Sequence, residues 1–316
     1  MSSDQIRLDH KLELECLPSN SPNSKFSCST STAPSSSVSF NHNSPRRILI
    51  TQQDWETGIH TALQPLLSKY PASGSPEWSR KDALTAFASV ERDLQAQNPE
   101  MLYSELLARA HQLLEQRLRV AAGLPADDPT ARAHTSISTP NSDAPTSTSE
   151  SEPHVVFADS IKTWAPFPDT VDALYTLARH FKLAVLSNVD RVAFAHTHDK
   201  LSRPGVDSPF TLVLTAQDTS AYKPSLIPLT TALSAIASSP ALRCAPRQEV
   251  LVVAQSLYHD HTPAKALGTR SVWIEREPSF MGAVAEDAVG RTSGVLWTWR
   301  FSTLGEMAEA VERESG

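Results

Sequence analysis

A cluster of polar side chains follows a short apolar run in the second half of the chain. Val250–Ala254 consists of apolar and largely β-branched residues, which predicts a strand buried on both faces. Directly after it come side chains that can hydrogen-bond or carry charge: Gln255, Ser256, Tyr258, His259, Asp260 and His261. Open parallel sheets bind ligands at the carboxyl ends of their strands, so this cluster is a candidate site for binding or chemistry. The alternative is an ordinary strand-to-helix loop whose polar groups face water.

Two further predicted strands are also followed by polar residues. Ser187-Asn188 ends one of them, and Lys223-Pro224 lies downstream of another. Taken singly, Ser-Asn is typical of a turn, Lys-Pro of a helix entry, and an Asp before a helix of an N-cap. Because successive parallel strands end at one edge of a sheet, we expect Ser187, Lys223 and Asp260 to lie in one cleft.

The elements that position these residues alternate between strands and helices after Ser160. This rhythm predicts parallel β-α-β units with right-handed crossovers. The predicted strands are Leu183–Leu186, Phe210–Leu214, Val250–Ala254 and Ser271–Ile274, and the predicted helices cover residues 168–180, 224–237, 264–267 and 304–314.

The first half of the chain has a different texture. Three predicted helices follow one another without strands: one capped by Asp54, one over Arg80–Gln97, and one from Asn98 as the cap to Gly123. Residues 1–45 consist of a short charged segment and a tract, Pro18–Pro45, that is dominated by Ser, Asn, Pro and Thr; residues 125–153 are rich in Ser, Thr, Pro and Asp. We expect both regions to be disordered. Between the first tract and Asp54, Arg47–Thr51 forms a brief strand-like run.

Composition excludes several classes of protein. The 316 residues are 40% hydrophobic, enough for a sizeable core, and the net charge of −7 comes without a basic block that would suit nucleic acid. No apolar run approaches the roughly 20 residues that span a bilayer, and the amino terminus resembles neither a signal peptide nor a mitochondrial presequence. The three cysteines lack paired spacing, which argues against a disulfide framework or a zinc site. We therefore expect a soluble, cytoplasmic protein that binds neither nucleic acid nor membranes.

Several segments together resemble one enzyme family. They read W-A-P-F-P-D-T-V-D-A-L (Trp164–Leu174), L-S-N-V-D-R (Leu186–Arg191), Y-K-P (Tyr222–Pro224), A-Q-S-L-Y-H-D-H-T-P-A-K (Ala254–Lys265) and D-W-E-T-G-I (Asp54–Ile59). In this combination the chain resembles the fungal-type haloacid dehalogenases of type II, within the haloacid dehalogenase-like hydrolase superfamily. The resemblance covers roughly residues 54–275, interrupted by the tract at 125–153.

The resemblance implies an α/β fold with a Rossmann-like parallel sheet and an inserted helical cap. On this reading residues 1–45 form a disordered tail, 46–53 a remnant of the first strand, 54–124 the cap, 125–153 a low-complexity insertion, and 154–316 the Rossmann-like core. The implied ligand is a small 2-haloacid or a similar carboxylate, with no cofactor and no metal. A homodimer is a further candidate assembly.

The resemblance also implies a mechanism. In this family an aspartate attacks the substrate's α-carbon, displaces halide, and forms an ester that water hydrolyses. Ser187 and Asn188 would hold the substrate carboxylate or orient the nucleophile. Lys223 would keep that nucleophile ionised, and Asp260 would pair with Lys223 and help to activate water. By the same resemblance Arg80, Ser256 and Tyr258 are candidates for substrate binding, although Arg80 also reads as a solvated surface arginine.

The chain departs from the family at the nucleophile. The family carries an Asp-x-Tyr-Gly-Thr signature on its first strand, and this sequence has none. Without gaps, the nucleophile's position falls on Arg47, a cation that cannot attack carbon, and only Thr51 coincides with the signature. The first core strand is therefore predicted to be missing or degraded, with Arg47–Thr51 docking imperfectly in its place.

Two explanations of this departure remain open. In one, the stretch before Asp54 comes from an error in the gene model that replaced the true first exon. In the other, the chain has lost catalysis and keeps the fold for binding. A magnesium-dependent phosphatase is a third functional alternative, which would need a further carboxylate after the nucleophile and an acidic metal site.

Overall fold

The computed structural model describes residues 47–51, 54–72, 77–124, 152–276 and 295–315. The tracts predicted to be disordered, residues 1–45 and nearly all of 125–153, lie outside the described residues. Among the described helices, none combines the length and apolar character needed to cross a membrane.

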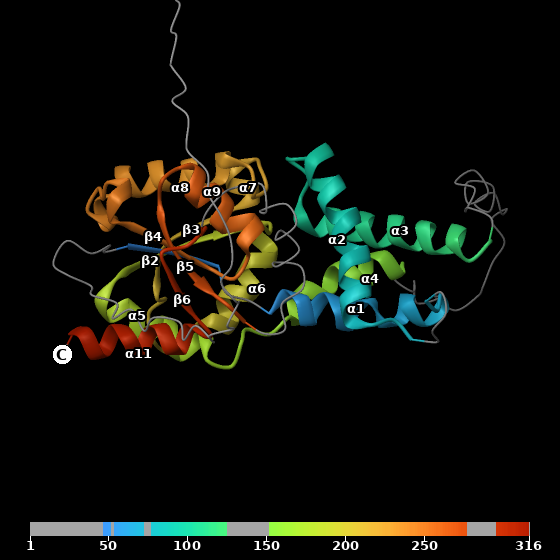
Figure 1. Ribbon diagram of the computed structural model, residues 1–316, viewed down its shortest axis with the longest axis horizontal. Helices are drawn as coiled ribbons and strands as arrows, with labels where there is room; N and C mark the ends of the chain where they lie inside the picture. Colours follow the sequence, from blue (N-terminus) through green and yellow to red (C-terminus); the bar gives the residue numbers. More distant parts are fainter. Residues whose placement is uncertain (1–46, 52–53, 73–76, 125–151, 277–294, 316) are drawn as a thin grey trace, which may run out of the picture. The chain divides into compact units, whose positions relative to one another are not determined.

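The core is a sheet of six strands (Figure 1). The strands are parallel, as the alternating pattern predicts, but the edge strand β6 was not among the predicted strands. The strands are β1 (Arg47–Thr51), β2 (Lys182–Ser187), β3 (Phe210–Thr215), β4 (Val250–Ala254), β5 (Arg270–Ile274) and β6 (Trp299–Phe301). Their spatial order is β3-β2-β1-β4-β5-β6. Strands β2 and β3 therefore lie on one side of β1, and β4, β5 and β6 lie on the other. The strand order reverses at β1, which creates a switch point at the carboxyl edge.

Strand β1 occupies the central position, so the prediction that Arg47–Thr51 takes the place of the first core strand is confirmed. The strand is not missing, and its pairing is regular, not imperfect as predicted. All five of its residues pair in register with β4, from Arg47 opposite Val250 to Thr51 opposite Ala254. Four of them also pair with β2. Ile48, Leu49 and Ile50 are buried, since a central strand has both faces covered. The docking is therefore regular, and what the strand lacks is the family's signature residues.

Helices cover both faces of this sheet (Figure 1). On one face Ile48 and Ile50 pack with residues of α5 (Thr170–His180), α6 (Arg191–Leu201) and α11 (Leu304–Ser315). On the other, Leu49 packs with residues of α8 (Leu226–Ser238) and α9 (Thr262–Ala266). The alternation of Ile48, Leu49 and Ile50 between the two clusters is the period of two expected of a strand. These helices hold the strand ends in place.

The helical module has its own hydrophobic cluster, separate from the two on the faces of the sheet. It contains α1 (Trp55–Lys69), α2 (Arg80–Gln97), α3 (Tyr103–Ala121) and α4 (Pro153–Asp159). Asp54 caps α1 as predicted, since its side chain accepts a hydrogen bond from the N–H of Thr57. The predicted start of the third helix is wrong: Asn98 ends α2, and α3 begins at Tyr103.

Residues after Pro153 also join this module. Phe157, Ala158, Ile161 and Trp164 belong to the same buried cluster as α1–α3. The sequence placed residues 154 onward in the core, so we extend the proposed cap to include α4 and the short helix Ser160–Thr163 that follows it.

Candidate functional site

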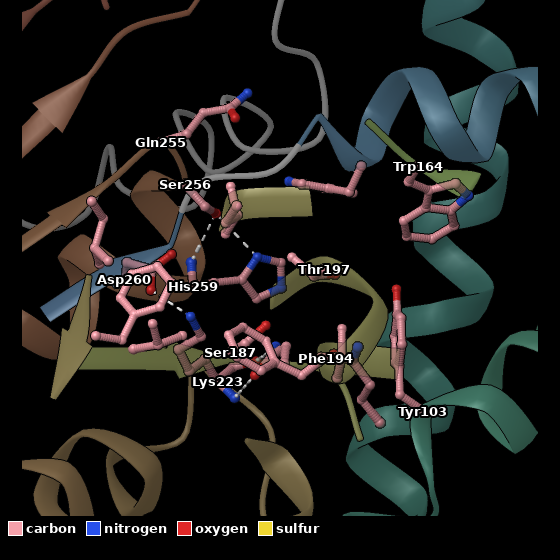
Figure 2. A pocket seen from close by; sticks show the side chains of 18 of the residues that line it. Tyr103, Trp164, Ser187, Phe194, Thr197, Lys223, Gln255, Ser256, His259 and Asp260 are labelled. Carbon is pink, nitrogen blue, oxygen red and sulfur yellow. Dashed lines mark hydrogen bonds and ion pairs between the residues drawn. The ribbon is translucent and has the colours of Figure 1, made fainter. Parts of the chain in front are cut away.

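The polar residues at three strand ends surround one cavity of about 110 Å³. Ser187 ends β2, Lys223 follows β3 through the short helix α7 (Ala216–Thr219), and Asp260 follows β4. All three line the cavity, as their positions on successive parallel strands predict (Figure 2). Helices of the module supply the facing wall, so the cavity lies at the sheet's carboxyl edge with the cap beside it.

Lys223 and Asp260 form a buried ion pair at the floor of this cavity. The Lys223 Nζ donates to Asp260 Oδ1 at 2.7 Å and to the backbone oxygen of Leu186 at 2.9 Å. Both residues are under a tenth exposed. Two opposite charges withdrawn from water stabilise one another only as a pair, because either alone would carry a large desolvation penalty.

Asn188 positions Lys223 through its backbone. Its amide oxygen accepts the Lys223 N–H at 2.8 Å, and its amide nitrogen donates to the Lys223 carbonyl at 3.0 Å. Both polar ends of the side chain are therefore committed to the loop that carries the lysine. Both Asn188 and Ser187 line the cavity, and Asn188 in addition positions the loop of Lys223.

The loop after β4 is folded by its own polar residues. The Ser256 hydroxyl accepts the backbone N–H of His259 and lies 3.0 Å from His259 Nδ1. Burial lowers the pKa of His259 to about 4, against the opposing effect of Asp260, and Lys223 and Arg92 add to the lowering. At neutral pH the ring is uncharged. Since the Ser256 proton is available to Nδ1, the proton of the neutral ring belongs on Nε2.

His261, the second histidine of this loop, is fully buried and structural. One ring nitrogen contacts the Ser271 hydroxyl and the other contacts the backbone oxygen of Ala254. Burial lowers the pKa of His261, so it fixes the loop to β4 and β5 as a neutral ring.

The cap side of the cavity is mostly aromatic, with one buried carboxyl group. Figure 2 shows Tyr103 and Trp164 on this side, opposite Lys223, Asp260 and His259. Glu91 of α2 also lines the cavity, and its Oε1 accepts a 2.8 Å hydrogen bond from the Tyr103 hydroxyl. The sequence reasoning missed Glu91, Tyr103 and Trp164 as site residues. A signal existed for the first, because Glu91 lies on the apolar face of α2, in helical register with Leu84, Phe87 and Leu94.

Two of the three predicted substrate-binding residues are not among the residues that line the cavity. Arg80 donates to the Thr57 hydroxyl at 3.1 Å, which attaches α2 to α1. Tyr258 packs beneath the guanidinium of Arg92, 5.3 Å from the ring centre, and so contacts the cap instead of the cavity. Ser256 does line the cavity.

Arg47 lies at the opposite edge of the sheet from Lys223. Its register partners Lys182 and Val250 are the first residues of β2 and β4. The Arg47 side chain is buried, donating from Nε to the Leu242 oxygen and from one terminal nitrogen to Glu249 at 2.9 Å. The gapless placement of the nucleophile on Arg47 is therefore wrong, because β1 ends beside the cavity only at Thr51.

The end of β1 carries no acid. Arg47–Thr51 contains no carboxylate, and the next two residues in the sequence are Gln52 and Gln53. Within the described ranges, no group of three or more His, Cys, Asp or Glu is arranged to hold a metal ion.

Comparison with known proteins agrees with this architecture. A family model described as haloacid dehalogenase-like hydrolase matches residues 108–274, more than half of the chain. The chain belongs to this family. The match begins after β1 and includes the strand ends that carry Ser187, Lys223 and Asp260.

Solved structures share the haloacid dehalogenase-like fold at low sequence identity. The putative hydrolase YfnB from Bacillus subtilis, bound to magnesium, is 13% identical with a TM-score of 0.54, over 86% of this chain and 100% of that one. An L-2-haloacid dehalogenase from Xanthobacter autotrophicus, with chloropropionic acid covalently bound, is 15% identical with a TM-score of 0.52, over 85% and 98%. A defluorinating L-2-haloacid dehalogenase is 21% identical with a TM-score of 0.51, over 85% and 95%. No curated protein matches the sequence.

Proposed function

We propose that this member of the haloacid dehalogenase-like family binds a small carboxylate of the 2-haloacid class and, with the sequence it has, does not hydrolyse it. The resemblance to type II dehalogenases points to that ligand class. The observation that carries the proposal is the buried pair of Lys223 and Asp260 beside a strand end without a carboxylate. The residues to which the resemblance gives supporting roles line one cavity, and β1, as far as the structure describes it, offers no attacking carboxylate.

The charges of the site oppose an anionic ligand less than they would if an aspartate ended β1. An aspartate at the end of β1 would place a second carboxylate near Lys223, which already has Asp260 at 2.7 Å. Without it the pair is close to neutral overall, and a ligand carboxylate meets less repulsion. Ser187 and the Nε2 of neutral His259 add uncharged hydrogen-bond donors to the same side of the cavity.

The chemistry that a restored aspartate would perform is a two-step displacement. Its carboxylate oxygen forms a bond to the α-carbon while the carbon–halogen bond breaks and halide leaves with the electron pair. Water then adds to the ester carbonyl, which releases a 2-hydroxy acid and regenerates the carboxylate. We assign Lys223 to holding that carboxylate ionised and Asp260 to accepting the proton of the attacking water.

The test compares the full chain with variants that restore an acid at the strand end. Thr51→Asp and Gln52→Asp are made separately, and 2-chloropropionate binding is measured by calorimetry together with halide release. We expect the native chain to bind without releasing halide, and one of the two variants to release it. Lys223→Met should abolish binding. Halide release by the native chain, or its failure to bind any short carboxylate, would overturn the proposal.

Two further measurements address the alternatives. Phosphate release from a small phosphomonoester with magnesium tests the phosphatase, for which the strand end again supplies no acid. Sequencing the transcript across codons 1–60 tests the gene-model explanation, since a contiguous message encoding this stretch would exclude it. We also propose that the protein is cytoplasmic and forms a homodimer. Light scattering on the purified chain tests the homodimer.

A further inference from the structure

Glu91 is an acidic residue at a position where helix α2 would otherwise be apolar. Its neighbours on the same helix face, Leu84, Phe87 and Leu94, are all buried in the cap's core. Burying a carboxyl group there is unfavourable unless it is hydrogen-bonded or neutral. Stability of the cap alone therefore does not account for an acid at this position.

The Glu91 carboxyl accepts a hydrogen bond from Tyr103 and also lines the cavity. Within the described residues its one hydrogen bond comes from the Tyr103 hydroxyl to Oε1, at 2.8 Å. Both residues line the same cavity as Lys223 and Asp260. Tyr103 is in turn packed against the Tyr222 ring, with 6.3 Å between the ring centres, which restrains the ring that carries the hydroxyl.

The pair is mostly uncharged below neutral pH, and Glu91 ionises as the pH passes through about 7. Burial raises the pKa of Glu91 to about 7, with Tyr103 and Arg92 acting in the opposite direction. Burial, followed by Glu91, also raises the pKa of Tyr103. Tyr103 therefore donates to Oε1, and the proton of the neutral Glu91 carboxyl can be donated from Oε2.

We propose that Glu91 and Tyr103 form a second polar subsite in the cap, which binds a hydroxyl or carbonyl oxygen at the end of the ligand remote from Lys223. The ligand class is then a small carboxylic acid with a neutral oxygen at its far end. This inference rests on the proposed carboxylate binding. Between the two polar ends the cavity wall contains apolar side chains, among them Phe194, Val189 and Trp164, which suit the carbon chain that joins them.

The test uses pairs of acids that differ only by a terminal hydroxyl: butanoate with 4-hydroxybutanoate, and pentanoate with 5-hydroxypentanoate. Calorimetry on the full chain at pH 6 should show tighter binding of the hydroxy acid in at least one pair. One neutral hydrogen bond predicts about a three- to tenfold preference. The pair with the larger preference reports the separation of the two polar ends.

Variants at Glu91 separate hydrogen bonding from charge. Glu91→Gln keeps a donor and should keep the preference, while Glu91→Leu should lose it; Glu100→Gln, at an exposed position after α2, is the matched control. In the native chain both acids should bind more weakly at pH 8 than at pH 6, because ionised Glu91 repels them, and Glu91→Gln should remove this change. The other titratable or charged groups that face the subsite are Arg92, Tyr222 and Asp190, with Lys223, Asp260 and His259 across the cavity.

The outcomes are distinguishable from failure of the carboxylate proposal. If the members of both pairs bind equally well to the native chain, or if Glu91→Leu keeps the preference, the subsite is refuted while carboxylate binding stands. If no acid of either pair binds, the carboxylate proposal fails and the subsite with it. A preference that Glu91→Gln retains and Glu91→Leu loses supports the subsite.

Discussion

At the scale of single residues, the Lys223–Asp260 pair makes a measurable contribution to stability. Asp260→Asn leaves a buried ammonium group without its anion, and we expect a loss of about 3–5 kcal/mol in the free energy of unfolding. Lys223→Met should also destabilise, by leaving Asp260 unpaired. Urea denaturation measures both changes.

The double variant Lys223→Met, Asp260→Leu is the informative comparison for this pair. Because it removes both charges together, it should cost less than the sum of the single changes. Asp93→Asn serves as the matched control: its partner Arg117 lies 3.3 Å away, but both side chains are more than half exposed, so the loss should stay within about 1 kcal/mol. Additive losses at Lys223 and Asp260 would show that the two charges do not depend on one another.

Glu91 makes the free energy of unfolding fall as pH rises, the opposite of the usual effect of an acidic residue. Its folded pKa of about 7 lies above the ordinary glutamate pKa of 4.5, so between these two pH values the folded state holds a proton that the unfolded state has lost. The free energy of unfolding therefore falls as pH rises from about 4.5 to 7, and levels off above that. We expect Glu91→Gln to match the native chain near pH 4.5 and to exceed it by up to roughly 3 kcal/mol at pH 8. Equal stabilities of the two proteins at pH 8 would contradict a buried, protonated Glu91.

At the scale of elements, local pattern was enough for some boundaries and not for others. The limits of α2 and β4 follow directly from their apolar spacing and caps, and both match the structure. Asn98 was misassigned because one residue with a capping side chain serves equally well at the end of one helix and the start of the next. For β1 the sequence was informative in a different way: the apolar residues Ile48, Leu49 and Ile50 indicate a strand, but its register depends on pairing with β2 and β4.

The site residues divide in the same way. Ser187, Lys223 and Asp260 could be placed together from strand order alone, since parallel strands end at one edge. The sequence could not show that Arg80 lies outside the cavity, because its contact with Thr57 depends on how α1 and α2 pack. Trp164 and Tyr103 enter the cavity through packing of the cap, which no local pattern encodes.

Helix α1 depends on one glycine for its contact with the cavity wall. A Cβ on Gly58 would lie 2.4 Å from the Trp164 ring, closer than any real contact, so the ring or the helix must move. We expect Gly58→Ala to destabilise the chain by about 1–3 kcal/mol and to weaken ligand binding, because Trp164 lines the cavity. Thermal unfolding and calorimetry measure the two effects.

Gly305→Ala in α11 is the matched control for this change. There the nearest atom to an added Cβ is 3.4 Å away, an ordinary contact, and alanine favours a helix by roughly 0.5–1 kcal/mol over glycine. The control should be neutral or stabilising and should leave binding unchanged. If both glycine variants behaved alike, helix propensity and not the Trp164 contact would explain the effect at Gly58.

At the scale of the whole molecule, a small number of polar contacts join the cap helices to the core. The Tyr222 hydroxyl donates to the Met101 carbonyl at 2.6 Å, and Arg92 of α2 stacks on Tyr258. The most unusual of these contacts is made by Asp190, whose buried carboxylate caps two helices at once. Oδ1 accepts from the N–H of Ala193 in α6, and Oδ2 accepts from the N–H of Ser104 in the first turn of α3.

Asp190→Ala therefore removes the N-terminal hydrogen bond of α6 in the core and that of α3 in the helical module. Each of these two N-terminal hydrogen bonds contributes about 1 kcal/mol, so we expect the free energy of unfolding to fall by about 2 kcal/mol. Amide exchange should become faster in the first turns of both α6 and α3. Ser79→Ala is the matched control, because it removes an N-cap that serves α2 alone and should leave exchange in α3 and α6 unchanged. Since α3 begins with Tyr103, loosening its first turn also displaces a residue of the cavity wall, and ligand affinity should fall with Asp190→Ala but not with Ser79→Ala. If amide exchange became faster only in α6 and ligand affinity were retained, the helical module would be held in place without Asp190.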